Sequence, residues 1–201
     1  MMRLMLATGN AGKVRELAGA FPGTEVEIAP AGFDPDETGD TLYQNAVIKA
    51  EALRAMTDGS LVILADDSGL FVHALDGRPG VFSARYAGPG ATYADNCNLL
   101  LKELDGQTDR SAAFVCVLVA LLPDGRRLVA EGNCPGHITE SGRGEGGFGY
   151  DPVFLPLGQT RTMAEMTGDQ KDEISHRGRA VRQMAALLGL TTPRDLATLP
   201  R

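Results

Sequence analysis

The chain contains few cysteines, few aromatic residues and no long hydrophobic run. Its 201 residues include three cysteines, no tryptophan and 5% aromatic residues. The cysteines are odd in number and show no CxxC spacing, which argues against a disulfide framework or a zinc site and predicts a cytoplasmic protein. The longest apolar run, residues 112–122, has about half the length that spans a bilayer. No signal-peptide pattern follows the N-terminal stretch, so we expect no membrane association.

Positive charge is also scarce. The chain has 19 Lys and Arg against 26 Asp and Glu, which gives a net charge of −7. This balance excludes a general binder of nucleic acid, because such a protein needs the opposite sign. Any phosphate must be bound locally, by a few cations, backbone N–H groups or a metal. The length and the 43% apolar content predict a single domain over 1–201, at most two small lobes around a shared core.

Hydrophobic periodicity predicts strands and helices in alternation. We expect an α/β fold with a mixed sheet, because at least one pair of strands forms an antiparallel hairpin. The expected strands cover 3–7, 24–28, 61–65, 111–122 and 127–132, and the expected helices cover 12–21, a segment after the Thr41 cap, 92–104 and 175–189.

A glycine-rich turn follows the first expected strand and opens a helix. Free N–H groups and the positive end of a helix dipole at such a turn suit a phosphate chain. An ordinary strand-to-helix turn is the alternative. A Walker A loop is disfavoured, because only two residues separate the glycines and Val14 follows the lysine. The turn consists of Thr8, Gly9, Asn10, Ala11, Gly12 and Lys13.

Two adjacent carboxylates, Asp66 and Asp67, follow the expected strand 61–65. Carboxylates beside an apolar core are costly unless they bind a cation or accept hydrogen bonds. Neighbours on a strand point to opposite faces, so only one of them can face a given site. A solvated turn is the alternative reading. Glu37, in the acidic loop 30–40, can hold Mg²⁺ jointly with Asp67, although Asp34, Asp36 and Asp40 compete for that role.

Two further segments carry candidate ligand groups. The glycine cluster 139–152 contains Phe148 and Tyr150, which can offer a stacking surface to a planar base. A formal GxGxxG in this cluster lacks the strand–turn–helix context of a dinucleotide site. Lys171, His176 and Arg177 lie near the start of the last helix, where cations oppose the dipole and make sense beside an anion or a carbonyl-rich ligand. The alternative for the glycine cluster is a flexible loop. The alternative for Lys171, His176 and Arg177 is a solvated basic face.

Taken together, these segments resemble the inosine triphosphate pyrophosphatase family. The resemblance rests on TGNAGK at 8–13, ETGDT at 37–41, ADDSGLFVHALDGRPGVFSARYAG at 65–88, GFGYDPVF at 147–154 and AEMTGDQKDEISHRGRA at 164–180. It implies an elongated mixed β-sheet flanked by helices, with two lobes and a central substrate cleft. It also implies a Mg²⁺-dependent homodimer that cleaves ITP, dITP and XTP to the monophosphate and pyrophosphate, which removes deaminated purines from the nucleotide pool.

The resemblance also implies roles for individual residues. Asp67 is the catalytic carboxylate, and Glu37 and Asp67 are the metal ligands. Residues 8–13 hold the phosphates, and the remaining substrate contacts are Ser68, Phe148, Gly149, Tyr150, Asp151, Lys171, His176 and Arg177. The sequence leaves open whether Asp66 takes the base role or the metal role. A pyrophosphatase for modified pyrimidine nucleotides, a catalytically silent nucleotide-binding regulator and a generic phosphatase are the rival readings.

Overall fold

A computed structural model describes residues 2–21 and 23–190. These residues form an α/β fold with a mixed sheet flanked by helices, as predicted. In chain order the strands and α-helices are β1 (Met2–Leu6), α1 (Ala11–Ala18), β2 (Thr24–Ile28), α2 (Leu42–Arg54), β3 (Val62–Val72), β4 (Pro79–Gly80), α3 (Tyr93–Glu103), β5 (Ser111–Leu121), β6 (Arg127–Ile138), β7 (Phe154–Pro156), α4 (Gly168–Ile174) and α5 (His176–Leu187).

The seven strands of the described residues follow the order β2-β1-β3-β5-β6-β7, with β4 paired to β3. The sheet is mixed, because β1 pairs in parallel with both β2 and β3, whereas the β3–β4 and β6–β7 pairs are antiparallel. The turn 122–126 joins β5 to its neighbour β6, which is the predicted hairpin.

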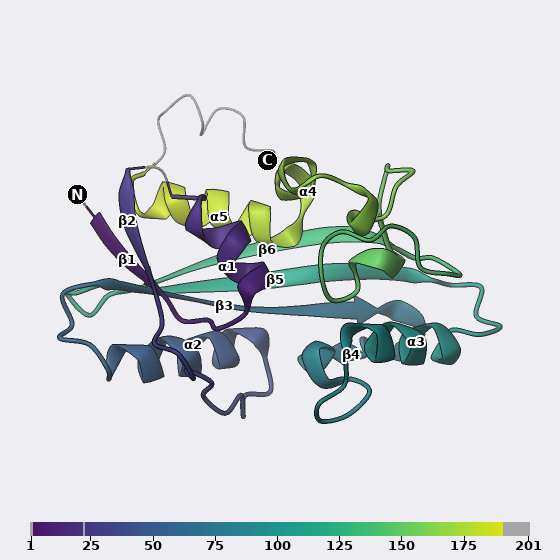
Figure 1. Cartoon of the computed structure of the whole chain (residues 1–201), viewed down its shortest axis with the longest axis horizontal. Coiled ribbons are helices and arrows are strands. Elements are labelled where there is room, and N and C mark those ends of the chain that lie inside the picture. The colour runs from purple at the N-terminus through teal and green to yellow at the C-terminus, as the bar shows by residue number, and fades with distance from the viewer. Residues whose placement is uncertain (1, 22, 191–201) are drawn as a thin grey trace. The chain divides into compact units, whose positions relative to one another are not determined.

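The chain divides into two compact units. Unit 1 contains the described residues within 1–67, 117–132 and 177–201, and unit 2 contains 68–116 and 133–176. Residues 1, 22 and 191–201 of the expected domain lie outside the described residues. In unit 1, α1 and α5 lie on one side of the strands and α2 on the other (Figure 1). In unit 2, α4 and α3 likewise lie on opposite sides of the strands (Figure 1).

Local sequence signals explain several boundaries. Thr41, the predicted cap, forms a capping box with Gln44 at the start of α2, which satisfies backbone donors at that end. Thr92 and Asp95 form an equivalent box before α3. Helix α1 ends earlier than predicted, because Gly19 follows its last residue and glycine disfavours helix continuation. The short helix α4 was not predicted.

The predicted end of the strand at residue 65 was wrong. Strand β3 continues through Asp66 and Asp67 to Val72. Asp, Ser and Gly are depleted in strands, but β4 pairs with this segment at Leu70 and Phe71. A Cβ atom at Gly69 would lie 2.5 Å from the Gly80 carbonyl oxygen, so the glycine permits the close approach of β4. Asp66 and Asp67 therefore lie within a strand, two and three residues beyond its last pair with β1.

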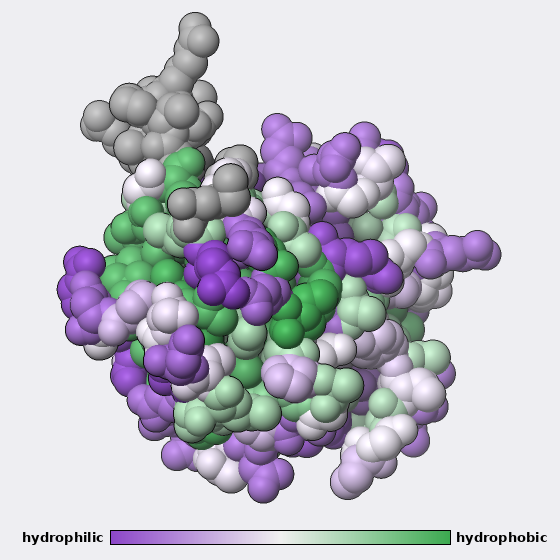
Figure 2. All heavy atoms as spheres, turned by 60° about the vertical axis from the view of Figure 1, so that its left-hand side comes forward, coloured by the Kyte–Doolittle hydropathy of each residue, from purple (hydrophilic) through white to green (hydrophobic). Residues whose placement is uncertain are grey.

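The buried cores are mostly aliphatic, with an aromatic pair in unit 2, and the surface is mixed. Leu4, Leu6 and Ile63 are fully buried in unit 1, and Phe114 packs on Phe154 in unit 2 with ring centroids 4.6 Å apart. All three cysteines are buried and free, in agreement with the sequence reading. Figure 2 shows hydrophobic residues at the surface among hydrophilic ones. Each helix in the described ranges is too short or too polar to cross a bilayer.

Candidate active site

The turn after β1 is fixed by its own side chains. Asn10 Oδ1 caps α1 by accepting hydrogen bonds from the backbone N–H groups of Gly12 (2.9 Å) and Lys13 (3.2 Å). Thr8 Oγ1 accepts a bond from the Asn10 N–H at 3.2 Å. Three backbone amides of the turn that was predicted to bind phosphate, those of Asn10, Gly12 and Lys13, are therefore already bonded. The Lys13 side chain, only 16% exposed, remains the positive group of this turn, and it points to β3.

Asp66 on β3 holds two cations. Its Oδ2 atom lies 3.0 Å from Lys13 Nζ and 3.3 Å from Arg177 Nε. Arg177 also donates through Nη1 to Glu16 Oε2 on α1. Burial acts to raise the pKa of Asp66, but the charges of Lys13, Arg177 and Lys49 outweigh it and hold that pKa well below its usual range. The positive charges around Asp66 therefore favour its ionised form.

Asp67, the next residue on β3, contacts a different set of groups. Lys49 Nζ on α2 donates to Asp67 Oδ1 at 3.0 Å and to Glu37 Oε1 at 2.7 Å. Asn45, one turn earlier on the same helix, donates through Nδ2 to Asp67 Oδ2 at 3.2 Å. Burial alone lowers the pKa of Lys49, but attraction by Asp67, Asp66 and Glu37 outweighs it and raises that pKa. Two carboxylates thus converge on one buried cation.

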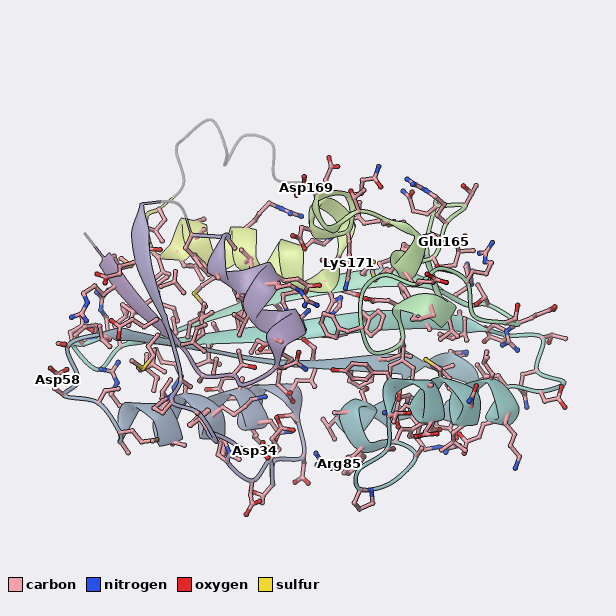
Figure 3. The ribbon with its side chains drawn as sticks, viewed as in Figure 1. Asp34, Asp58, Arg85, Glu165, Asp169 and Lys171 are labelled. Atoms are coloured by element: carbon pink, nitrogen blue, oxygen red, sulfur yellow. The ribbon has the colours of Figure 1, made fainter. Side chains whose placement is uncertain are left out.

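The loop before α2 places Glu37 over Lys49. Asn45 Oδ1 accepts the Gly39 N–H at 2.8 Å, and Gln44 Oε1 accepts the Asp40 N–H at 2.7 Å. A Cβ atom at Gly39 would lie 2.6 Å from the Gln44 Cβ, so the fold of this loop needs glycine. Among the acidic residues of the loop, Glu37 is half-buried, whereas the competitors Asp34, Asp36 and Asp40 are exposed. Asp34 is labelled in Figure 3, on the loop that precedes α2.

The side chains of Asp66 and Asp67 contact partners on opposite faces of the sheet, as the alternation of side chains along a strand predicts. The partners of Asp66 come from α1 and α5, and those of Asp67 come from α2 and the loop before it. These helices lie on opposite sides of the strands in Figure 1. The Lys49 charge nevertheless lowers the pKa of Asp66, so the two sets lie within electrostatic reach of each other.

Within the part of the chain that the structure describes, no group of three or more His, Cys, Asp or Glu side chains is placed to hold a metal. Glu37 and Asp67 form a pair rather than such a group. One or two carboxylates are what Mg²⁺ usually takes from a protein when substrate phosphates supply further ligands. The pair therefore fits Mg²⁺, whereas structural zinc sites are closed by four cysteine and histidine ligands.

In unit 2, the loop 147–151 is held by several hydrogen bonds. Asp151 Oδ2 accepts the Phe148 N–H at 2.8 Å, the Tyr150 hydroxyl donates to the Ser83 carbonyl at 2.9 Å, and the Cys97 thiol donates to the Gly149 carbonyl at 3.4 Å. Gly147 has a φ of +72°, and a Cβ atom there would overlap the Asp151 carboxylate. The loop therefore holds the half-buried Phe148 ring in a defined position.

Lys171 joins this loop from α4. Its Nζ donates to Asp151 Oδ2 at 2.6 Å and lies 4.5 Å from the centroid of the Phe148 ring. Both charged side chains are almost fully buried, at 6% and 4% exposure. Figure 3 shows Lys171 on the side of α4 that faces the strands and Asp169 on its outer side. An aromatic ring, an ammonium group and a carboxylate thus gather at one place, a combination that suits a planar polar ligand.

The remaining predicted residues are Ser68, His176 and Arg177. Ser68 follows Asp67 on β3 and is half-buried. His176 is buried and stacks on Phe114, with centroids 4.7 Å apart and an interplanar angle of 11°. Arg177, its neighbour in the chain, belongs to unit 1 and contacts Asp66 and Glu16. The predicted residues thus form two sets, one in each unit.

The sequence reading missed three members of the unit 1 set: Lys49, Asn45 and Glu16. Lys49 and Asn45 are buried and lie four residues apart, so they share one face of α2. Their neighbours Ala46 and Ala50 belong to the buried apolar stripe of the same helix. Two polar residues four positions apart, next to an apolar stripe, are the pattern from which Lys49 and Asn45 could have been predicted as buried site residues. Glu16 offered no comparable signal, because it lies on a helix with several exposed positions.

Comparison with known proteins adds an independent observation. A model described as the Ham1 family matches residues 4–187. A dITP/XTP pyrophosphatase of Geobacillus kaustophilus is 47% identical over 191 residues, which cover 92% of this chain and 93% of the relative. One of Deinococcus radiodurans is 49% identical over 189 residues, with 93% of both chains covered. The solved structure of the Staphylococcus aureus Ham1 protein is 39% identical, with a TM-score of 0.84 over 93% of this chain and 98% of that one.

Proposed function

Because this chain belongs to the Ham1 family, we propose that it hydrolyses dITP, XTP and ITP to the nucleoside monophosphate and pyrophosphate. Its role is to remove deaminated purines from the nucleotide pool of the cytoplasm, as a homodimer. The dITP/XTP pyrophosphatase relatives support the activity. The observation in this chain that carries the proposal is the convergence of Glu37 and Asp67 on one buried cation, Lys49.

Mg²⁺ is the proposed cofactor, and Glu37 and Asp67 are its proposed ligands. The charged groups in contact with Asp66, Asp67 or their ion-pair partners are three cations (Lys13, Lys49 and Arg177) and four carboxylates (Glu16, Glu37, Asp66 and Asp67), which leave one net negative charge. A triphosphate carries several more negative charges, so it requires additional positive charge at this place. Glu37 and Asp67 would hold a Mg²⁺ ion that would supply that charge and polarise a phosphoryl oxygen.

The contacts favour Asp67 over Asp66 as the catalytic base. Asp66 is fully buried and its Oδ2 atom is shared by Lys13 and Arg177, so it is committed to holding cations. Asp67 accepts from Lys49 and Asn45 and remains slightly exposed. We propose that Asp67 accepts a proton from the attacking water and that Lys49 orients its carboxylate. Lys13 neutralises the phosphate chain from the turn 8–13.

We assign recognition of the purine base of the substrate to residues of unit 2. The Phe148 ring stacks on the purine, and Lys171 and His176 act as donors toward its 6-oxo group, with Asp151 holding Lys171 in place. Adenine presents an amino donor at the same position, which would face a donor. An unpaired buried donor costs about 1–3 kcal/mol, or roughly tenfold to a hundredfold in rate. This contrast explains why an oxo-purine is preferred over adenine.

Product analysis with a panel of nucleotides tests the proposal. The protein is incubated with dITP, XTP, ITP, ATP, GTP and dTTP, with and without Mg²⁺, and the products are identified by chromatography and phosphate assays. We expect monophosphate and pyrophosphate from the first three, little product from the others and none without a divalent ion.

Each rival reading has its own outcome in this assay. Orthophosphate as the first product identifies a phosphatase and contradicts the proposed cleavage site. Turnover of dTTP but not dITP indicates a pyrimidine nucleotide enzyme. Binding without turnover of any nucleotide indicates a regulator.

A further inference from the structure

The first half of α3 contacts the loop 147–151 within unit 2. The Cys97 thiol on this helix donates to the Gly149 carbonyl at 3.4 Å. Burial and the charge of Asp151 raise the pKa of this thiol to about 11, so it keeps its proton at neutral pH. Tyr93 lies four residues before Cys97, and residues four apart share one face of a helix. The face of α3 that contacts the loop therefore begins with Tyr93.

The Tyr93 side chain contacts the ring of Phe148. The two ring centroids are 6.2 Å apart, and the ring planes are tilted by 45°. Tilted aromatic pairs at this separation attract each other beyond the effect of burial alone. Tyr93 is 46% exposed and Phe148 is half-buried, so the pair lies at the surface of unit 2.

Bonds outside the loop fix the start of α3. Thr92 and Asp95 form a capping box around its first turn, which contains Tyr93. One residue later, the buried Asn96 accepts the Ala87 N–H through Oδ1 at 2.8 Å. A buried hydrogen bond of this kind is stronger than one exposed to water. The position of Tyr93 is therefore set independently of the loop that it contacts.

The loop fixes the backbone of Phe148, but the orientation of its side chain depends on other contacts. The bond from the Phe148 N–H to Asp151 Oδ2 leaves rotation about the Cα–Cβ bond free, and this bond has three staggered minima. Lys171 Nζ lies 4.5 Å from the ring centroid, and Tyr93 contacts the ring from a different helix. Lys171 is held by Asp151 and Tyr93 by α3, so the two contacts restrict the ring separately.

We propose that Tyr93 is a positioning residue for the purine base, which holds the Phe148 ring in the orientation that stacks on the base. The inference rests on the proposed function and deepens it, because Tyr93 lies outside the motifs that carry the family resemblance. A ring that is already oriented loses less conformational freedom when the base binds, so Tyr93 increases affinity for the nucleoside part of the substrate. Phosphate binding and the chemical step do not depend on Tyr93.

Steady-state kinetics with dITP test the inference. The unchanged protein is compared with Tyr93→Ala, Tyr93→Phe, Phe148→Leu and the double variant of Tyr93→Ala with Phe148→Leu. We expect Tyr93→Ala to raise the KM for dITP about fivefold and to leave kcat unchanged. Tyr93→Phe keeps the ring and is expected to keep the original KM. In the Phe148→Leu background, Tyr93→Ala has little further effect, because the residue through which it acts is gone.

Tyr43→Ala is the matched control. Tyr43 also lies in the first turn of a helix and is 39% exposed, and its hydroxyl accepts a hydrogen bond from Arg127 Nη1 at 3.1 Å. Both variants change helix propensity in the same way, and Tyr43→Ala is expected to keep the original KM. Inhibition by inorganic pyrophosphate is expected to be equal in all variants, because this probe carries phosphates and no base.

Four outcomes contradict the inference. The KM is unchanged in Tyr93→Ala, or Tyr93→Phe behaves like Tyr93→Ala, which assigns the effect to the hydroxyl group. The KM rises equally with and without the Phe148 ring, which indicates that Tyr93 contacts the base directly. Pyrophosphate inhibition or kcat falls together with dITP affinity, which indicates a general structural defect.

Failure of the proposed function has a different result. The unchanged protein then does not cleave dITP at all, and the inference falls with the proposed function. Normal cleavage by the unchanged protein together with any of the four outcomes contradicts the role of Tyr93 alone.

Discussion

The two units of this chain present their polar residues in different ways. In unit 1, three cations and four carboxylates form contacts around the middle of β3. In unit 2, one buried ion pair, Lys171 and Asp151, lies beside the Phe148 ring. The first arrangement suits a highly charged group, and the second suits a flat, weakly charged one. The proposed function assigns the phosphates to the first set of residues and the base to the second.

The largest effect is expected from Asp67→Asn. The substitution keeps the shape of the side chain but removes the proposed base and metal ligand, so kcat falls by about 10²–10⁴-fold. Turnover of dITP by the purified variant measures this. Asp124→Asn, in the exposed turn before β6, is the matched control and keeps normal turnover. Near-normal activity of Asp67→Asn would show that Asp67 is neither the catalytic base nor an essential metal ligand.

Breaking the buried ion pair of unit 2 is expected to affect stability. Lys171→Met leaves the Asp151 carboxylate buried beside a neutral side chain, which costs about 3–5 kcal/mol in the free energy of unfolding. Urea denaturation measures the loss. Arg126→Met breaks the exposed pair with Asp124 and costs less than about 1 kcal/mol. Equal losses in the two variants would contradict the structural importance of the buried pair.

A pair of glycine substitutions tests the geometry of the loop 147–151. Gly147 and Gly149 both have positive φ, +72° and +64°, so alanine strains either position by about 1–2 kcal/mol. Only at Gly147 does the added Cβ also overlap the Asp151 carboxylate. We therefore expect Gly147→Ala to lower dITP turnover and thermal stability more than Gly149→Ala does. Identical behaviour of the two variants would show that Asp151 tolerates displacement.

The smallest effect is expected from Phe148→Leu. Loss of the ring removes base stacking worth about 1–3 kcal/mol, so the KM for dITP rises about tenfold and kcat changes little. Steady-state kinetics measure both constants. Pyrophosphate inhibition serves as the internal control, because it involves no base and is expected to stay constant. A parallel loss of pyrophosphate affinity would argue against the separate roles of the two units.

The sequence predicted the mixed α/β fold and most of its elements. Strand β2 and the Thr41 capping box were found at the expected residues because local patterns determine them. The course of β3 through Asp66 and Asp67 was not predictable, because pairing with β4 and the missing side chain at Gly69 override the local preference of these residues. The family was predicted from sequence motifs alone, and the comparisons with known proteins confirm it.

The candidate site was only partly predictable. Alternation along a strand predicted that Asp66 and Asp67 face different partners, and their contacts agree. The bridging role of Lys49 depends on a loop that brings Glu37 next to α2, and no local pattern shows that distance. The contacts of Arg177 with Glu16 and Asp66 join residues more than 100 positions apart, so only the fold reveals them.

Amide chemical shifts of the labelled protein test the division of roles most directly. Inorganic pyrophosphate with Mg²⁺ and, separately, inosine are titrated into the protein, and the shifts of both units are followed. The account predicts that pyrophosphate changes the amides of residues 8–13, 66 and 67, whereas inosine changes those of 147–151 and 171. Pyrophosphate shifts centred on 147–151, or inosine shifts centred on 8–13, would contradict it.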